Sequence, residues 1–437
     1  MNNDRLKYSV AVILTFLLGT AVFAKVPAVC LKEVCEGYAA TSVNTAVFRG
    51  SSLATHGDTQ FISYYDGDGN VVLGKRKLGE DNWNLHKTRY KGNIKDAHNV
   101  ISIGVDGDGY LHVSFDHHGH PLRYARGLAP GSLELGELMP MTGNDEKDVT
   151  YPEFYTMPDG DMIFAYRSGA SGRGNLVLNR YSKKEKKWDR IHDVLIDGED
   201  KRNAYWQIFV DSEGIIHLSW VWRETWLVET NHDLCYARSS DGGKTWQRSD
   251  GSIYELPITM DTAEVAWKIP QKSELINQTS MTADSKGNPF IASYWRDAGS
   301  EVPQYRLVWH DGSKWQMSTV GKRSKPFSLA GGGTKMIPIA RPRIVSDGKK
   351  ACYIFRDEER GSKVSIAYTT SIGKKDWVVM DATEFPVDAW EPSHDLNLWN
   401  RKHKLHVFVQ PSHQGDGEKV AETSEEISKV YVLEVDM

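Results

Sequence analysis

The chain has 437 residues, of which 40% are hydrophobic and 25% are charged, and its formal net charge at pH 7 is −5. Basic and acidic residues are interspersed along the sequence, which argues against nucleic acid as a partner and against a polybasic membrane patch. A chain of this length ordinarily folds into two or three domains, unless an internal repeat builds one larger unit.

The first 24 residues have the features of a secretory signal peptide. Arg5 and Lys7 precede an apolar run from Val10 to Phe23, and a small residue, Ala24, stands at the expected cleavage site. We therefore predict a signal peptide over residues 1–24 and export of the mature chain to the periplasm or the cell surface. The apolar run is too short to favour a membrane anchor, and we expect no membrane span elsewhere.

The four cysteines fall into two groups. Cys30 and Cys35 are five residues apart just after the signal peptide, and in an oxidising compartment this pair is a candidate for a small disulfide. Cys235 and Cys352 stand in apolar surroundings and are predicted to be buried thiols. Because no C-x-x-C or H-x-x-x-H spacing occurs, we expect no metal site.

One sequence unit recurs seven times: a strand, a turn rich in Asp, Gly or Lys, and a second strand that ends in aromatic and charged residues. The equivalent apolar positions of the second strands are about fifty to seventy-five residues apart, which fits a four-stranded blade. They are Ile62, Val113, Phe164, Leu218, Ala292, Cys352 and Val407. The sequence therefore predicts an all-β fold, a seven-bladed β-propeller of four-stranded antiparallel blades that forms a single domain over residues 25–437.

Two further segments bear on this fold. The residues from Ser239 to Trp246 fit the S-x-D-x-G-x-T-W pattern of the Asp-box, a turn between the outer strands of sialidase-type propellers, and we assign it a structural role. The C-terminal KVYVLEVD and the early NTAVFRGSSLAT are predicted to close the ring by pairing.

A propeller places particular chain segments on the same face. The innermost strand of each blade is antiparallel to the second, so the start of the first and the end of the second emerge together. On that face we expect His98, His117, His118, Tyr151, Arg167, Asn203, Arg223, Asn277, Arg296, Arg341, Arg356 and Glu391. The recurring arginines suit binding of a carboxylate or a sulfate. The alternative is a structural ring of ion pairs with Asp116, Asp297, Asp357 and Glu358.

The opposite face carries turns that are rich in Asp and Gly in most blades. The first blade differs, because His56 stands in its turn. Histidine suits acid/base chemistry near neutral pH, although a lone histidine in a turn is more often an ordinary surface residue.

Several strings resemble the BNR-repeat propellers that include the ulvan-type polysaccharide lyases: AHNVISIGVDGDGYLHVSFDHHGH, TYPEF and FAYRSGASGRGN. Those lyases use two histidines, a tyrosine and an arginine. The resemblance maps these roles onto His98, His118, Tyr151 and Arg167, with His117 as a competitor for the place of His118. In such chemistry arginine neutralises a uronate carboxylate while histidine and tyrosine move protons.

Other strings look closest to the α-L-rhamnosidases of glycoside hydrolase family 145, which act on arabinogalactan: NTAVFRGSSLATHGDTQFISYYDGDGNVVLGKRKLG, ELINQTSMTADSKGNPFIASYWR and LHVFVQPSHQGDGE. That family uses a single histidine on the face opposite the usual one, aided by the substrate. The resemblance implies His56 as the catalytic residue, with Asp58 and Asp66 as nearby carboxylates that the sequence does not exclude.

Three functions follow from these observations. The first choice is an exported glycoside hydrolase that removes α-L-rhamnose linked to glucuronic acid in arabinogalactan-type glycans. The alternatives are a lyase that cleaves an ulvan-like, uronate-containing glycan by β-elimination, and an inactive carbohydrate-binding propeller. Each requires an acidic plant or algal polysaccharide as partner, no cofactor and no metal, and we expect a monomer. The substrate-binding residues would be His117, Arg223, Asn277, Arg296, Arg341 and Arg356.

Overall fold

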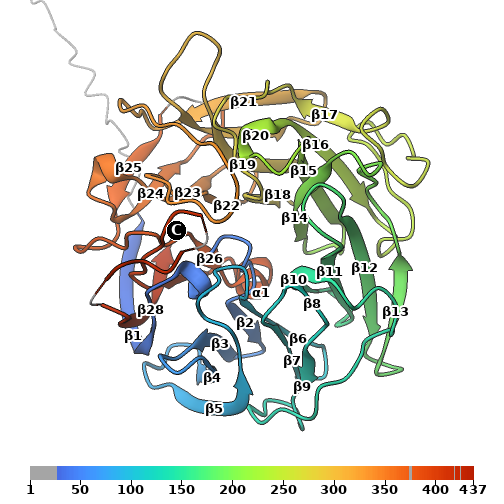
Figure 1. Cartoon of the computed structure of the whole chain (residues 1–437), viewed down its shortest axis with the longest axis vertical. Coiled ribbons are helices and arrows are strands. Elements are labelled where there is room, and N and C mark those ends of the chain that lie inside the picture. The colour runs from blue at the N-terminus through green and yellow to red at the C-terminus, as the bar shows by residue number, and fades with distance from the viewer. Residues whose placement is uncertain (1–26, 374–375, 418, 424) are drawn as a thin grey trace, which may run out of the picture.

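The alternating apolar residues of the seven repeats form seven antiparallel sheets arranged around a central axis (Figure 1). The computed structural model describes residues 27–373, 376–417, 419–423 and 425–437, so the signal peptide predicted over residues 1–24 lies outside the described residues. All seven apolar positions singled out above fall in the second strand of a blade. The predicted seven-bladed propeller is confirmed.

The first four blades follow the chain in order. Blade 1 contains β2 (Leu53–His56), β3 (Thr59–Tyr65), β4 (Asn70–Lys77) and β5 (Asn84–Lys91). Blade 2 contains β6 (Ile101–Val105), β7 (Leu111–Phe115) and β9 (Tyr124–Arg126). Blade 3 contains β10 (Val149–Thr156), β11 (Met162–Ser168), β12 (Asn175–Ser182), β13 (Lys187–His192) and, on its inner edge, β8 (His118–His120). Blade 4 contains β14 (Asn203–Val210), β15 (Ile216–Arg223), β16 (Asn231–Ser239) and β17 (Glu264–Trp267).

The last three blades complete the ring. Blade 5 contains β18 (Ser280–Ala283), β19 (Pro289–Trp295), β20 (Gln304–His310) and β21 (Trp315–Val320). Blade 6 contains β22 (Arg343–Ser346), β23 (Ala351–Arg356), β24 (Val364–Thr369) and β25 (Val378–Asp381). Blade 7 contains β26 (Ser393–His394), β27 (Leu405–Val409), β28 (Ile427–Asp436) and β1 (Ala28–Tyr38). Three short 3-10 helices lie in connections, η1 (Ser42–Asn44), η2 (Val228–Thr230) and η3 (Glu358–Arg360).

Two blades do not have the predicted number of four strands. Blade 2 has three, and blade 3 gains β8 as a fifth. The reason is local, because the chain that leaves blade 2 after β7 turns aside and pairs His118 with Thr150 at the start of β10. This crossing from one blade to the next brings His118 to the inner edge of blade 3.

The ring closes through β1. This strand pairs antiparallel with β28, from Ala28 opposite Asp436 to Tyr38 opposite Ile427. The prediction for the C-terminal KVYVLEVD is therefore confirmed. The prediction for NTAVFRGSSLAT is wrong, because its end forms the innermost strand of blade 1, β2.

The close cysteine pair does not have the geometry of a disulfide. Cys30 and Cys35 lie along the same extended strand, β1, and both thiols are free. Five residues of strand span roughly 16 Å, whereas disulfide-bonded Cα atoms lie about 4.4–6.8 Å apart. Cys235 and Cys352 are buried thiols, as predicted.

A short helix, α1 (Leu396–Lys402), interrupts blade 7 between β26 and β27. Its side chains contact three other blades: Asn397 donates to Thr156 Oγ1 at 3.3 Å, Asn400 to the Val210 carbonyl at 2.6 Å, and Lys402 to the Gly57 carbonyl at 3.0 Å. One cavity beside α1, toward blades 1 to 4, is about 20 Å³, little more than one water molecule occupies, and another of about 200 Å³ lies between α1 and the turns of blades 4 to 6. The helix therefore fills the axis of the ring on the face that carries the His56 turn (Figure 1).

The Asp-box is a structural turn after β16. The Asp241 carboxylate accepts hydrogen bonds from the backbone N–H groups of Lys244 and Thr245 at 3.0 Å, and Trp246 is fully buried.

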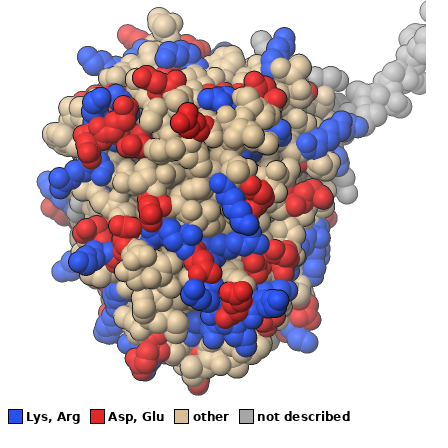
Figure 2. Space-filling model, turned by 90° about the vertical axis from the view of Figure 1, so that its right-hand side faces the viewer, with Lys and Arg blue, Asp and Glu red and all other residues tan. Residues whose placement is uncertain are grey.

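No helix among the described residues is long and apolar enough to cross a membrane. Basic and acidic side chains alternate over the side of the ring shown in Figure 2.

Candidate active site

A cavity of about 880 Å³ opens on the face where the first strands begin and the second strands end. Its wall contains seven of the residues that the sequence places on this face, together with Phe48 from a connection. The seven are His98, Tyr151, Arg223, Asn277, Arg341, Arg356 and Glu391. The strand directions of a propeller thus bring together side chains from blades 2 to 7, as predicted.

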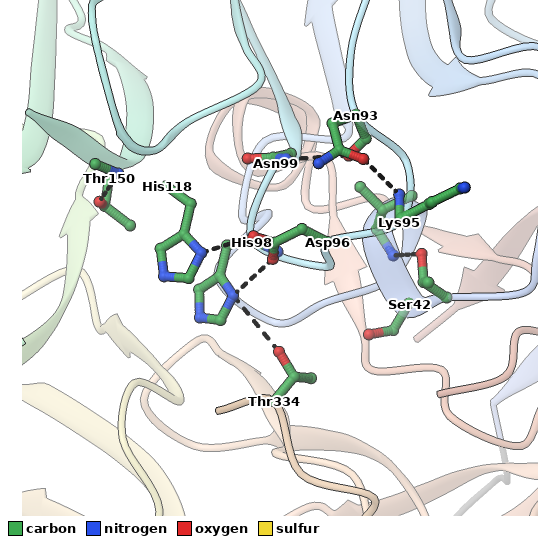
Figure 3. Close-up of polar contacts among 12 residues, drawn as sticks. Ser42, Asn93, Lys95, Asp96, His98, Asn99, His118, Thr150 and Thr334 are labelled. Atoms are coloured by element: carbon green, nitrogen blue, oxygen red, sulfur yellow. Dashed lines mark hydrogen bonds and ion pairs between the residues drawn. The ribbon is translucent and has the colours of Figure 1, made fainter. Parts of the chain in front are cut away.

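Two stacked histidines share one carboxylate beside this cavity, and His98 is the one of the two in its wall (Figure 3). The rings of His98 and His118 lie 3.9 Å apart between centroids with an interplanar angle of 13°. Asp96 Oδ1 is 3.0 Å from His98 Nδ1, and Asp96 Oδ2 is 2.7 Å from His118 Nδ1. A further contact comes from Thr334, whose Oγ1 lies 3.5 Å from His98 Nδ1.

The electrostatics of this group favour a neutral His98 beside an ionised Asp96. Burial lowers the pKa of His98 to about 4. Burial opposes ionisation of Asp96, but the hydrogen bonds from His118 and His98 outweigh it and hold the pKa of its carboxyl well below the usual range. Because an ionised carboxylate only accepts hydrogen bonds, His98 carries its proton on Nδ1 and presents Nε2 as its basic nitrogen.

Tyr151 is held in an unusual backbone conformation. It lies in β10 where the pairing with β11 slips between Thr150 and Glu153, and its φ of 57° is in the left-handed region. Its ring contacts Phe48 at 5.1 Å and lies 5.8 Å from His98. Burial raises the pKa of Tyr151 to about 12, so its hydroxyl keeps its proton at neutral pH.

Arg167 packs against the far side of this tyrosine. Its guanidinium carbon lies 5.0 Å from the Tyr151 ring centroid, and its Nη2 donates to Thr150 Oγ1 at 3.2 Å. The side chain is buried, Nε has no hydrogen-bond partner, and none of the ion pairs among the described residues includes Arg167. A buried guanidinium in this state is a natural place for an anionic group of a ligand.

The other predicted arginines have different partners. Arg341 forms a bidentate ion pair with Glu391 at 2.6–2.7 Å, and Arg296 pairs with Glu274 at 2.6 Å outside the cavity wall. Arg223 donates to Asn277 Oδ1 at 3.3 Å, and Arg356 to the Ile337 carbonyl at 3.1 Å. The alternative interpretation, a structural ring of ion pairs with the predicted carboxylates, does not apply to these arginines, because Asp116 pairs with Arg123, Asp297 with Arg306 and Asp357 with Arg323.

His117 and His118 point in opposite directions. His117 is fully buried, its Nε2 accepts the backbone N–H of Arg123 at 2.8 Å, and burial lowers its pKa to about 3. Of these two histidines, only His118 contacts Asp96, which favours His118 for the place of the second histidine. His117 has no access to the cavity, and its assignment to substrate binding receives no support.

His56 lies at the end of β2 on the face that α1 occupies, far from the cavity. Its ring stands next to Gly109 in the corresponding turn of blade 2. None of the cavities described above includes His56 in its wall. The hydrolase hypothesis therefore concerns a different region of the surface from the histidine, tyrosine and arginine cluster.

Four residues that contact the predicted histidines and tyrosine were not predicted from the sequence: Phe48, Asp96, Tyr205 and Thr334. Asp96 stands two residues before His98, where its carboxylate also caps the backbone N–H of His98 at 2.9 Å, a spacing that suggests a turn. Tyr205 lies 6.2 Å from Tyr151 at the start of β14, on the predicted face. Phe48 and Thr334 come from connections whose course strand patterns do not determine.

The fold and this cluster define a class, the seven-bladed propellers with a polar pocket at one end of the axis. Within it, the chain belongs to the BNR repeat-containing family, whose model matches residues 59–323.

The curated relatives are ulvan lyases. The long isoform from Alteromonas sp is 22% identical over 341 residues, which cover 60% of this chain and 34% of that protein. The short isoform from Alteromonas sp. (strain LOR) is 22% identical over 306 residues, which cover 53% of this chain and 57% of that protein. The chain thus spans about a third of the length of the first of these relatives and somewhat over half of the second.

Solved structures show the same fold. The polysaccharide lyase Uly1 superposes with a TM-score of 0.67 at 15% identity over 89% of this chain and 90% of that one. An ulvan lyase of family PL25 bound to -[GlcA(1-4)Rha3S]- superposes with a TM-score of 0.63 at 16% identity over 89% and 96%.

Proposed function

We propose that this protein is a polysaccharide lyase that cleaves a uronate-containing, ulvan-like glycan by β-elimination. The observation that carries the proposal is that His98 and Tyr151 line one cavity and that Arg167, which has no carboxylate partner, packs against the Tyr151 ring. The similarity to ulvan lyases supports this function over the hydrolase, and none of the relatives described here is a rhamnosidase.

The protonation states suit this chemistry. Arg167 binds the uronate carboxylate and stabilises the negative charge that develops when the C5 proton leaves. Neutral His98 accepts that proton through Nε2, and Tyr151 donates its proton to the departing glycosidic oxygen. The C5–H and C4–O bonds break, a C4=C5 double bond forms, and one proton moves to each of the histidine and the leaving oxygen.

The cavity also suits an anionic polymer. Arg223 and Arg356 lie in its wall, and within the described part of the chain their guanidinium groups bind amide and carbonyl oxygens rather than carboxylates. Their positive charge therefore remains available to sulfate or carboxylate groups of neighbouring sugars. The -[GlcA(1-4)Rha3S]- unit bound by the solved ulvan lyase is such a substrate, and we propose the same class here.

The test is incubation of the purified protein with ulvan and, separately, with arabinogalactan. Ultraviolet absorbance reports the unsaturated uronate, and chromatography reports free rhamnose. We expect absorbance with ulvan that is lost in His98→Ala and Tyr151→Phe. Arg296→Gln is the matched control, because Arg296 lies on the same face but outside the cavity wall. Rhamnose release without absorbance, abolished by His56→Ala, would replace the lyase with the hydrolase.

We also propose that the protein acts outside the cytoplasm, because a polymeric substrate must be met before uptake and residues 1–24 have a signal-peptide pattern. Fractionation of the producing cells, followed by N-terminal sequencing of the mature protein, tests this. Recovery of the intact N-terminus in the cytoplasm would contradict it.

A further inference from the structure

Three side chains of the types that bind transition metals converge beside the cavity. Asp96, His98 and His118 each offer a ligand atom, and these atoms lie within 4.8 Å of one another. They come from two separate segments, the connection before β6 and the strand β8, which is fixed by its pairing with β10. Both histidines turn the same nitrogen, Nδ1, toward the one carboxylate (Figure 3).

We propose that this group binds one divalent transition-metal ion, of which Zn²⁺ is the representative, through the two Nδ1 atoms and an Asp96 oxygen. Imidazole nitrogen with a single carboxylate is a ligand set that favours Zn²⁺, Co²⁺, Ni²⁺ or Cu²⁺ over Ca²⁺ and Mg²⁺, which prefer oxygen. Three protein ligands leave a further coordination position for water or for a group of the substrate.

The distances from the carboxylate to the two nitrogens require only a small adjustment. Tetrahedral zinc with bonds of about 2.0–2.1 Å places its ligand atoms roughly 3.3 Å apart. Here the carboxylate oxygens lie 3.0 Å and 2.7 Å from the two nitrogens. His118 can move to widen this spacing, because 27% of its side chain is exposed, and an ion can reach the group from the same side.

Other histidine–carboxylate contacts in the molecule lack this convergence. His112 and His217 each meet one aspartate in the core, with a tyrosine hydroxyl at the other nitrogen. His232 contacts two carboxylates, but through different nitrogens, with Glu224 at Nε2 and Asp233 at Nδ1. Among the described residues, Asp96, His98 and His118 are the one group of three ligand-type side chains this close together.

Metal binding and elimination would compete for His98. An ion on Nδ1 displaces the hydrogen bond to Asp96 that orients the ring, and the neutral ring then carries its proton on Nε2, the nitrogen that would otherwise accept the C5 proton. We therefore expect Zn²⁺ to inhibit the enzyme reversibly. This consequence rests on the proposed function, whereas the binding of the ion does not.

The binding experiment uses Co²⁺ and Zn²⁺ alone with the full-length mature protein. We expect visible absorbance from one equivalent of bound Co²⁺, displaced by Zn²⁺, and calorimetric heat for Zn²⁺ but not for Ca²⁺. In His118→Ala and Asp96→Asn the affinity for Zn²⁺ should fall by more than about tenfold. His232→Ala is the matched control and should bind as the wild type does, and thermal melting checks that each variant is folded.

Absence of Co²⁺ absorbance and Zn²⁺ heat in the wild type would overturn the proposal, as would unchanged affinity in a folded His118→Ala. A lyase assay with and without Zn²⁺, followed by addition of a chelator, then separates the two claims. If the protein shows Co²⁺ absorbance but no activity on ulvan, the metal site is supported and the proposed function is wrong. If the protein is active on ulvan but binds no metal, the proposed function is supported and the metal site is wrong.

Discussion

Arg167 and Arg341 are both buried near the cavity, yet their charges have different surroundings. Arg341 is neutralised by two short contacts to Glu391, while Arg167 meets a threonine hydroxyl and the face of Tyr151. Removing Arg341 would leave a buried carboxylate without its partner, whereas removing Arg167 leaves none. The two residues therefore separate a structural role, that of Arg341, from the catalytic role that we propose for Arg167.

Arg167→Gln should reduce kcat/KM on ulvan by about 100- to 1000-fold, the usual effect of losing one group that stabilises transition-state charge. The melting temperature should change little, because no ion pair is broken. Steady-state kinetics and thermal melting measure the two effects. A variant with activity within about threefold of the wild type would remove Arg167 from the mechanism.

The Arg341–Glu391 pair gives a pH dependence of stability. Burial opposes ionisation of Glu391, but Arg341 outweighs it and lowers the pKa of Glu391 below its usual value. The folded pKa lies below the unfolded value of roughly 4.3, so the pair contributes fully above that pH. Its contribution is lost as the pH falls through the folded pKa.

Glu391→Gln should therefore destabilise the protein at pH 7 by about 3–5 kcal/mol, since it leaves the Arg341 charge buried and unpaired. The difference in the free energy of unfolding between this variant and the wild type should become smaller as the pH is lowered below roughly 4. Denaturant unfolding at several pH values measures this. A difference that stays constant with pH would show that the ion pair is not its source.

Strand direction placed His98, His118, Tyr151 and Arg167 on one face with eight other residues, because the starts of first strands and the ends of second strands share a face. The resemblance to the ulvan-type lyases singled these four out as one group. Their acidic partner was not predictable. The position of Asp96 depends on a turn, and the crossing of β8 to blade 3, which brings His118 to it, follows from no strand pattern. The carboxylates that pair with the arginines were not predictable for the same reason, since the course of the loops decides which carboxylate each guanidinium contacts.

At the scale of single elements, the blades reuse one buried network. In blade 2, His112 lies between Asp106 and the Tyr124 hydroxyl, and in blade 4, His217 lies between Asp211 and the Tyr236 hydroxyl. In both blades the same carboxylate also accepts the backbone N–H groups of the turn between the first and second strands. Each network thus ties that turn to the third strand.

His217→Ala should lower the free energy of unfolding by about 2–4 kcal/mol, because it leaves a cavity and removes hydrogen bonds from two buried groups. His86→Ala, at a partly exposed position in the outer strand β5, should change it by less than about 0.5 kcal/mol. Chemical denaturation gives both values. Equal effects in the two variants would contradict a structural role for the network.

At the scale of the whole molecule, the ring is held by the pairing of its two ends. Blade 7 takes three strands from the C-terminal part of the chain and its outermost strand, β1, from the N-terminal part. The sequence predicted the number of blades, because each repeat specifies its own sheet. It did not predict β1 as the closing strand, because its sequence does not resemble the repeat and its partner is the most distant strand in the chain.

Deletion of residues 27–38 should leave the edge of β28 unpaired and expose the apolar residues that β1 covers, so the protein should melt at a lower temperature and aggregate. Removal of residues 1–26 alone keeps β1 and is the control. Thermal melting with light scattering distinguishes the two. Equal stability would mean that β1 is dispensable for closure.

For the glycan substrate that we propose, helix α1 determines how a long chain would meet this ring. Because it blocks the axis on one face, the cavity on the other face is a dead end. A polymer cannot pass lengthwise through the molecule and has to lie across the open mouth. Fragments leave by the route through which the chain arrived, so each cut is expected to release the enzyme to bind elsewhere, and long products should dominate early in the digestion.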